Sequence, residues 1–302
     1  MKISESSKEH KARLRELRRH LGENIRGQDH VLDRVAATLI RGELRLTSPR
    51  RPKASFLFVG PTGVGKTELT NIFTAYLCGR LPVRLDMSEY QNQSSVEKLI
   101  GGSSDEIGLL GKAIGDADSG TLLFDEIEKA HPLVLDLLLQ VLDDARITLA
   151  SGRVLDLTGF YVVLTSNIGA REAMRMHSAP FASIERTVLA RVGQQLRPEL
   201  VGRVTDKLVF MRLPFEVQRG ICEQMMAAEL TRMKELGYEL AANTDAVEHA
   251  IRHGYHKALG ARPMRAAVEQ FIQSAVAEAL LEGRNGSGRL VADAHNNRLT
   301  IA

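Results

Sequence analysis

The segment from Phe56 to Thr67 reads FLFVGPTGVGKT and constrains the fold more than any other stretch of this chain. Four apolar residues suited to a buried strand run directly into the pattern G-x-x-x-x-G-K-T. Its glycines allow the backbone to curl so that N–H groups converge on phosphate oxygens, and the following helix points its N-terminus at the same anion. The strand before the loop and the helix-compatible TELTNIFTAYL after it supply the required context. The sequence therefore predicts a nucleotide site, with a chance match in a glycine-rich turn as the alternative.

The residue types in this loop have a chemical reason. Lys66 is expected to reach the β- and γ-phosphates, and the hydroxyl of Thr67 is expected to bind Mg²⁺. The loop residues that we expect to bind the nucleotide are Gly60, Pro61, Thr62, Gly63, Val64, Gly65, Lys66, Thr67 and Glu68.

The size and composition fit one large and one small domain. A chain of 302 residues exceeds the usual size of a single domain. No apolar run approaches the ~20 residues that span a bilayer, and the N-terminus lacks the apolar stretch of a signal peptide. Cys78 and Cys222 lie far apart without metal-like spacing, which indicates buried thiols in a reducing cytoplasmic setting.

Basic charge is concentrated at the N-terminus. Residues 1–20 hold seven Lys/Arg and three Asp/Glu, whereas the whole chain carries a net charge of only +3. Leu14, Leu17 and Leu21 recur along one face of a predicted helix. This segment is either a solvated connecting helix or an arm that docks a partner or touches nucleic acid.

Short apolar runs alternate with helix-compatible stretches along the first two thirds of the chain. This alternation predicts crossover units and an α/β fold in which helices flank a five-stranded parallel sheet. The strand candidates are Phe56–Val59, Val83–Leu85, Thr121–Phe124, Tyr161–Thr165 and Leu208–Phe210.

A smaller and mainly helical region follows Pro214. Helices are predicted from Glu216 to Leu236 and from Arg262 to Leu281. The tail RLVADAHNNRLTIA predicts a terminal β-hairpin around a turn at His295–Asn297. We therefore expect a basic helical segment at 1–25, a large nucleotide-binding domain at 26–213 and a small C-terminal lid domain at 214–302.

Polar side chains follow the third and fourth strand candidates. Asp125 and Glu126 come directly after the third, at the end of the strand where ligands bind in open α/β sheets. We expect Asp125 to hold Mg²⁺ through water and Glu126 to orient and deprotonate the attacking water, with a loop-capping acidic pair as the alternative. Asn167 follows the fourth strand, where its amide can hydrogen-bond the γ-phosphate and the lytic water or simply form a turn.

A set of motifs in one order and with ordinary spacing carries a family resemblance. They are GPTGVGKTE, DMSEY, LLFDEIEKAHP, LLLQVLDDAR, TSNIGA, RPELVGRVT and GARPMR. From about Gly27 to the C-terminus the chain resembles AAA+ ATPases of the Clp/heat-shock-100 class, in particular the second ATPase module of ClpB or ClpA. IEKAHP and GARP are more selective than the phosphate loop, because a generic P-loop protein needs neither.

The resemblance implies roles for further residues. Arg26-Gly27-Gln28 resembles the segment that contacts adenine, with Gly27 and Gln28 expected to bind the nucleotide. Asn167 would be sensor 1, and Arg262 would be sensor 2, which reaches the γ-phosphate. Arg203 matches the arginine finger that enters the neighbouring subunit's site, while Arg197 either assists it in trans or forms a surface salt bridge. The implied cofactors are ATP and Mg²⁺. The implied catalytic set is Lys66, Glu126, Asn167, Arg203 and Arg262.

Two segments depart from the family pattern. Clp-type translocases grip polypeptide with an aromatic GYVG-like loop between the second and third strands, but no Tyr, Phe or Trp lies between Tyr90 and Phe124. Ser103–Ile107 stands in that place and offers little apolar area. Between Ala170 and Gln195 no IGF- or IGL-like tripeptide occurs, so docking on a barrel peptidase is not expected.

Together these features predict a stand-alone ATPase that forms a homo-oligomeric ring, a hexamer by resemblance. It would remodel or assemble an unidentified protein client without aromatic-loop threading and without membrane association. Three alternatives stay open: a weak Clp-like unfoldase or disaggregase, a nucleic-acid-associated loader that uses the basic N-terminal arm, and a nucleotide-binding scaffold without turnover.

Overall fold

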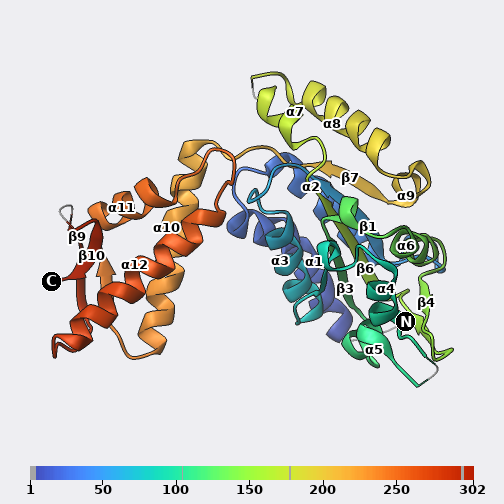
Figure 1. Ribbon diagram of the computed structural model, residues 1–302, viewed down its shortest axis with the longest axis horizontal. Helices are drawn as coiled ribbons and strands as arrows, with labels where there is room; N and C mark the ends of the chain where they lie inside the picture. Colours follow the sequence, from blue (N-terminus) through green and yellow to red (C-terminus); the bar gives the residue numbers. More distant parts are fainter. Residues whose placement is uncertain (1–4, 104, 177, 294–295) are drawn as a thin grey trace. The chain divides into compact units, whose positions relative to one another are not determined.

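The computed structural model describes residues 5–103, 105–176, 178–293 and 296–302. The chain divides into two compact units (Figure 1). The first unit comprises residues 1–60 and 65–211, and the second comprises residues 61–64 and 212–302. None of the helices in the described ranges is long and apolar enough to cross a membrane.

A parallel five-stranded sheet forms the centre of the first unit (Figure 1). Its strands lie in the order β2-β3-β6-β1-β7, and each neighbouring pair is parallel. Every residue of β1, β3 and β6 is buried, as expected for central strands covered on both faces. The predicted sheet is therefore confirmed, although the fifth strand begins two residues earlier and ends one residue earlier than predicted. The strands are β1 (Ala54–Val59), β2 (Val83–Asp86), β3 (Gly120–Asp125), β6 (Phe160–Ser166) and β7 (Asp206–Val209).

Helices cover this sheet and pack on its central strands. Helix α3 contacts β3 and β6, and α2 contacts β1 and β7. The rings of Phe73 on α3 and Tyr161 on β6 meet edge to face, with their centroids 5.7 Å apart, in a fully buried position. The helices are α1 (Glu5–Asn24), α2 (Asp29–Glu43), α3 (Lys66–Cys78), η1 (Met87–Glu89), α4 (Gln93–Ile100), α5 (Gly108–Ile114), η2 (Ile127–Lys129), α6 (Pro132–Asp144), α7 (Ala170–Arg175), α8 (Phe181–Gln195) and α9 (Pro198–Arg203). After α6, the chain forms a small antiparallel ribbon of β4 (Arg146–Thr148) and β5 (Val154–Asp156).

The basic N-terminal segment is part of the first unit. Its described residues from Glu5 onward form α1, and the three leucines Leu14, Leu17 and Leu21 are buried. The helix contacts α2 and α3 through this face, whereas Lys8 and Lys11 are exposed. The prediction of a solvated connecting helix is therefore wrong, because the face of α1 that carries the three leucines is buried.

The second unit combines helices with a small sheet (Figure 1). Its sheet has the strand order β10-β9-β8, in which β9 and β10 are antiparallel and β8 is parallel to β9. The predicted terminal hairpin is confirmed, although His295 of its predicted turn lies outside the described residues. The third strand was not predicted, because a three-residue strand has too little pattern to read. The elements are α10 (Phe215–Glu235), β8 (Leu240–Ala242), α11 (Thr244–Gly254), α12 (Arg262–Leu281), β9 (Gly288–Asp293) and β10 (Arg298–Ile301).

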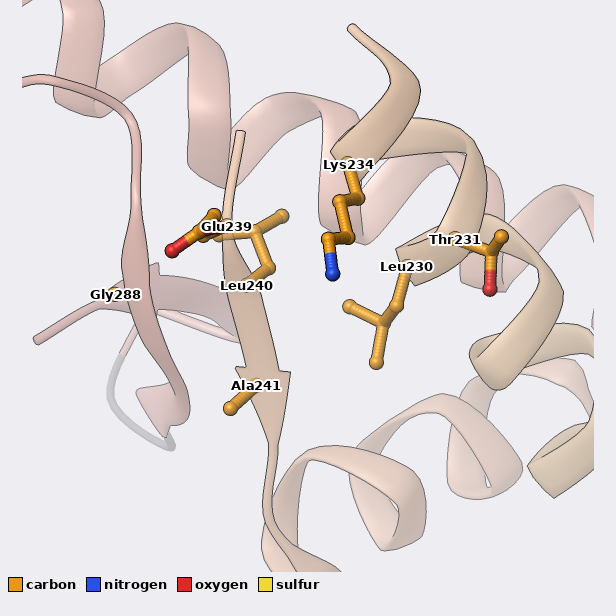
Figure 2. A pocket seen from close by; sticks show the side chains of 7 residues that line it. All are labelled: Leu230, Thr231, Lys234, Glu239, Leu240, Ala241 and Gly288. Carbon is orange, nitrogen blue, oxygen red and sulfur yellow. The ribbon is translucent and has the colours of Figure 1, made fainter. Parts of the chain in front are cut away.

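A hollow of about 430 Å³ lies between α10 and β8 in the second unit (Figure 2). Figure 2 shows Leu230 and Lys234 on the helix facing the strand that carries Leu240. The lining residues are Leu230, Thr231, Lys234, Glu239, Leu240, Ala241 and Gly288. None of them belongs to a motif that the sequence singles out, so volume alone does not make this hollow the candidate site.

Candidate active site

The segment between β1 and α3 has the backbone of a phosphate-binding loop. Gly60 and Gly65 have φ angles of 144° and 105°, a region that favours glycine. A Cβ atom on Gly60 would lie 2.5 Å from the carbonyl oxygen of Phe210, so no other residue fits there without displacement of the main chain. Gly65 immediately precedes α3, whose N-terminus therefore opens at the loop.

Lys66 is the first member of a hydrogen-bonded chain at the ends of three strands. Its side chain is buried, and Nζ donates to the carbonyl oxygen of Gly60 at 2.6 Å and to Oδ1 of Asn167 at 3.0 Å. The Nδ2 atom of Asn167 donates in turn to Oε1 of Glu126 at 3.2 Å. These residues follow β1, β6 and β3, which are neighbours in the sheet. Hydrogen bonds thus connect the ammonium of Lys66, the amide of Asn167 and the carboxylate of Glu126 in that order.

The carboxylate of Asp125 is held by two residues that sequence reasoning missed. Its Oδ1 accepts a hydrogen bond from the hydroxyl of Thr165, and its Oδ2 lies 2.7 Å from Nη2 of Arg84. The same Thr165 oxygen accepts the N–H of Glu126 at 3.1 Å. The only signal for Thr165 in the sequence is a polar residue near the end of an apolar strand. Its role depends on the register of β3 and β6, which pairs Phe124 with Leu164.

Glu126 has an unusual backbone conformation. Its φ and ψ angles are 58° and 52°, a left-handed conformation that is strained for a residue other than glycine. Its carboxylate forms an ion pair with Lys129, and this hydrogen bond raises the pKa of Lys129. Glu128 supports the same region, because its Oε1 accepts the N–H of Asn167 at 3.1 Å. Among the described residues, no hydrogen-bond partner reaches the buried Oε2 of Glu128.

The residues at this site fit a nucleoside triphosphate with Mg²⁺. The curled glycine backbone and the helix N-terminus provide N–H groups for phosphate oxygens. The buried ammonium of Lys66 offers a positive charge beside the loop, which suits an anionic ligand. Asp125 and Thr67 offer the hard oxygen atoms that Mg²⁺ prefers. Thr67 lies in the first turn of α3, next to Lys66.

The segment expected to contact adenine lies just before α2. Gly27 has a φ angle of 73°, and Gln28 is fully buried. The Gln28 amide donates to the carbonyl oxygen of Met211 at 2.8 Å and accepts the N–H of the same residue at 3.0 Å. This side chain therefore ties the segment to the chain that follows β7. The contact of Gly27 and Gln28 with adenine stays a prediction.

Arg262 belongs to the second unit, where it is the first residue of α12. Residues 61–64 of the phosphate loop group with the same unit. There the N–H of Ala261 donates to the carbonyl oxygen of Gly63 at 3.0 Å, and a Cβ on Gly63 would lie 1.9 Å from the carbonyl oxygen of Leu259. The GARP segment therefore contacts the tip of the loop, while the role of Arg262 as a sensor stays a prediction.

The two arginines of the RPELVGR motif are paired with aspartates of the same subunit. Nε of Arg203 lies 2.6 Å from Oδ2 of Asp143. Nη1 of Arg197 donates to Oδ1 of Asp136, also at 2.6 Å. The salt bridge that was the alternative for Arg197 is therefore present. The action of either arginine on a neighbouring subunit stays a prediction.

The Ser103–Ile107 segment, which stands where the resemblance places an aromatic loop, lies between α4 and α5. Ser104 lies outside the described residues. Glu106 turns back, and its Oε2 accepts the N–H of Gly102 at 2.8 Å. Ile107 is 44% exposed, and it is the single large apolar side chain of Ser103–Ile107. The loop therefore presents far less apolar surface than an aromatic grip would.

Two family models match the chain, one for each part of the fold. A model described as an AAA domain of the Cdc48 subfamily matches residues 51–207, more than half of the chain. A model described as the C-terminal D2-small domain of ClpB protein matches residues 213–292. The two matches follow one another along the chain in the order of the large and small regions.

Similar proteins carry Clp and heat-shock names. Heat shock protein 100 of Trypanosoma brucei brucei is 37% identical over 100% of this chain and 36% of its own length. Chaperone protein ClpB of Aquifex aeolicus is 34% identical over 96% of this chain and 30% of its own length. The chain thus spans about a third of the length of these relatives.

A solved structure agrees with these matches. It is described as a closed-state cryo-electron microscopy reconstruction of Hsp104 with ATPyS and FITC casein, and it matches 100% of this chain and 53% of its own with a TM-score of 0.86 and 29% identity. Membership of one family accounts for the sequence matches and also for the sheet order, the phosphate loop and the paired carboxylates of this chain. This chain belongs to the AAA+ ATPases of the Clp/heat-shock-100 class.

Proposed function

We propose that this chain binds ATP and Mg²⁺ at the Gly60–Thr67 loop and hydrolyses ATP to ADP and phosphate. In this proposal the chain works within a homo-oligomeric ring, a hexamer, that remodels or assembles a protein partner. The observation that carries the proposal is the hydrogen-bonded chain from Lys66 through Asn167 to Glu126. It joins a phosphate-binding cation to a carboxylate base through one amide.

The residues divide the chemistry between binding and proton transfer. The N–H groups of the loop and the Lys66 ammonium bind the phosphates, and Thr67 and Asp125 hold Mg²⁺. Bound Mg²⁺ supplies positive charge that neutralises the phosphate oxygens. Glu126 accepts a proton from the attacking water as its oxygen bonds to the γ-phosphorus and the bond to the bridging oxygen breaks. Asn167 fixes the direction of the Glu126 carboxylate, because its Nδ2 donates to Oε1.

Two arginines connect hydrolysis to movement. We propose that Arg203 contacts the ATP of a neighbouring subunit and that Arg262 contacts the γ-phosphate from the lid domain at 214–302. The large domain at 26–213 and the basic segment at 1–25 complete the module. An arginine finger contributes about 10³–10⁵ in rate, so a dilute monomer would be a poor ATPase. Loss of the γ-phosphate removes contacts that differ between states, and this loss would shift the domains and the subunit interface.

The Glu126→Gln variant tests this function. Its ATP binding should be retained, its hydrolysis should fall by roughly 10²–10⁴-fold because a general base is lost, and its ring should accumulate with saturating ATP. ATPase assays over a range of protein concentrations and sedimentation with and without ATP measure these outcomes. The matched control is Glu9→Gln on the exposed face of α1, which should behave as the unsubstituted protein. An unchanged hydrolysis rate, or a monomer with saturating ATP, would contradict the proposal.

A threading unfoldase is the second candidate. The structural relative described with casein favours it. The Ser103–Ile107 segment favours remodelling without threading, because Ile107 is its single large apolar side chain. Incubation of an unfolded, tagged reporter with ATP and the protein separates the two: an unfolded reporter that is drawn through the ring supports threading. A reporter that stays unengaged, together with active ATPase, supports remodelling without it.

A further inference from the structure

Two aspartates of α6 face two arginines at the ends of α9. Asp136 and Asp143 stand seven residues apart, so they share one helix face and lie about 10 Å apart along the axis. Arg197 immediately precedes α9 and Arg203 is its last residue, which separates them by about 9 Å of helix. Both ion pairs have a closest N–O distance of 2.6 Å. The spacing of the carboxylates therefore matches the spacing of the arginines.

Apolar packing, rather than the ion pairs, fixes the two helices. Helices α6 and α9 are in contact, and Leu138 of α6 and Leu200 of α9 are both buried in the same core cluster. Each leucine is about 1% exposed. Loss of one carboxylate would therefore free an arginine side chain without releasing α9 from the core.

The pair between Arg203 and Asp143 orients the arginine without locking it. The two side chains are 34% and 37% exposed, and ion pairs at such positions are weak and readily exchanged. The closest contact of Asp143 is with Nε, on the flank of the guanidinium. In the part of the chain that the structure describes, the terminal nitrogens of Arg203 donate no hydrogen bond. The two terminal nitrogens together can bind a phosphate in a bidentate manner.

We propose that Asp143 is a positioning residue that presents Arg203 to the ATP bound by the neighbouring subunit, and that Asp136 does the same for Arg197. Asp143 contacts no ATP itself and acts through Arg203. Ordering an arginine side chain costs conformational entropy, because the side chain loses much rotamer freedom. A nearby carboxylate that orders the arginine before the reaction lowers the entropy cost that remains in the transition state. The inference rests on the proposed function, because it requires Arg203 to act in trans.

Mixed rings of two variants test this directly. One protomer carries Arg203→Ala, which keeps its own catalytic site but donates no arginine. The other carries Glu126→Gln, which donates Arg203 but does not hydrolyse ATP. Hydrolysis by the mixture then arises where a Glu126→Gln protomer supplies Arg203 to an Arg203→Ala protomer. Adding Asp143→Asn to the donor should lower kcat by roughly 3- to 10-fold, a small part of the full arginine-finger effect, with KM for ATP and sedimentation unchanged.

The choice of the protomer that carries Asp143→Asn distinguishes a role in positioning Arg203 from a purely structural role. The same Asp143→Asn change in the Arg203→Ala protomer also removes the 3.9 Å pair between Asp143 and Arg51, but there is no Arg203 to present, so the rate should stay at that of the unsubstituted mixture. Asp144→Asn in the donor is the matched control, because Asp144 pairs with Arg146 of the β4 strand at 3.2 Å. Asp143→Glu keeps the carboxylate and should restore part of the rate.

The outcomes are distinguishable. An unchanged rate with Asp143→Asn in the donor overturns the inference and leaves the proposed function intact. An increased rate also overturns it, because the pair would then restrain Arg203 rather than present it. A mixture of Arg203→Ala and Glu126→Gln protomers that forms rings but does not hydrolyse ATP would show that Arg203 does not act in trans, and the inference would fall with that part of the proposed function.

Discussion

The Nζ atom of Lys66 lies 3.0 Å from Oδ1 of Asn167, although the two residues are 101 positions apart in the chain. This contact joins the phosphate loop to the end of β6. Because the amide of Asn167 also donates to Glu126 at 3.2 Å, a single side chain links the ammonium of Lys66 to the carboxylate of Glu126. Asn167 is therefore placed between the group proposed to bind phosphate and the group proposed to activate water.

Asn167→Ala should lower kcat for ATP hydrolysis by roughly 10²-fold, the typical effect of removing one fixed polar group from an active site. ATP binding should change much less, because the backbone cradle and Lys66 remain. Steady-state ATPase and nucleotide titration measure the two effects. The control is Asn24→Ala, whose amide donates to the carbonyl oxygen of His20 at the exposed end of α1. Equal losses of binding and turnover would argue against a role between lysine and carboxylate.

Gly60→Ala should destabilise the protein by more than about 1 kcal/mol, because alanine is strained at positive φ. The φ angle of Gly60 is 144°, and a Cβ atom at this position would lie 2.5 Å from the carbonyl oxygen of Phe210. Urea unfolding measures the change. Gly193→Ala in α8 is the control, and it should change the stability in the opposite direction. A Cβ atom at Gly193 meets no atom within 4 Å, so alanine, the better helix former, should stabilise the protein by about 0.5–1 kcal/mol. A tolerated Gly60→Ala would mean that the loop backbone is free to shift.

Leu17→Ala should lower the free energy of unfolding by about 2–5 kcal/mol, as for other fully buried leucines. Leu17 is 0% exposed on the face of α1 that contacts α2 and α3, whereas Leu46 is 71% exposed. Leu46→Ala should therefore change stability by less than about 0.5 kcal/mol. If both substitutions had the same small effect in urea unfolding, α1 would not be part of the folded unit.

His249 should make the second unit less stable at mildly acidic pH. Burial, and then the charges of His253 and Arg252, lower its pKa below the ordinary value of 6.5, while the backbone of Asn297 partly offsets this. Below pH 6.5 the unfolded chain therefore binds a proton that the folded state does not, so stability falls as pH decreases toward the lowered pKa and is retained above 6.5.

His249→Phe isolates this effect. The new ring retains the packing that His249 makes against Phe271, with centroids 4.7 Å apart, but does not titrate. Urea unfolding at pH 7.5 and pH 5.5 should show a smaller loss of stability in the variant than in the unsubstituted protein. Equal losses in the two proteins would assign the acid sensitivity to other groups.

The sequence predicted the central sheet well because its strands are continuous apolar runs between helix-compatible stretches. It missed β8, since Leu240–Ala242 is a strand only through its pairing with β9. The sequence also left open where α1 packs. The spacing of Leu14, Leu17 and Leu21 showed that the helix has an apolar face but not which surface covers that face. Both failures have one cause: the surface that pairs with β8 or covers α1 belongs to another element, and the segment itself does not show which one.

The candidate site shows the same division. The sequence by itself determined the phosphate loop, the acidic pair and Asn167, because these depend on glycine backbone freedom and on polar residues that directly follow apolar strands. Only the tertiary structure decided that Thr165 and Arg84 hold Asp125, that Asn167 lies between Lys66 and Glu126, and that Asp143 holds Arg203. Each of these contacts joins segments whose approach depends on strand register and helix packing, and local sequence carries no record of either.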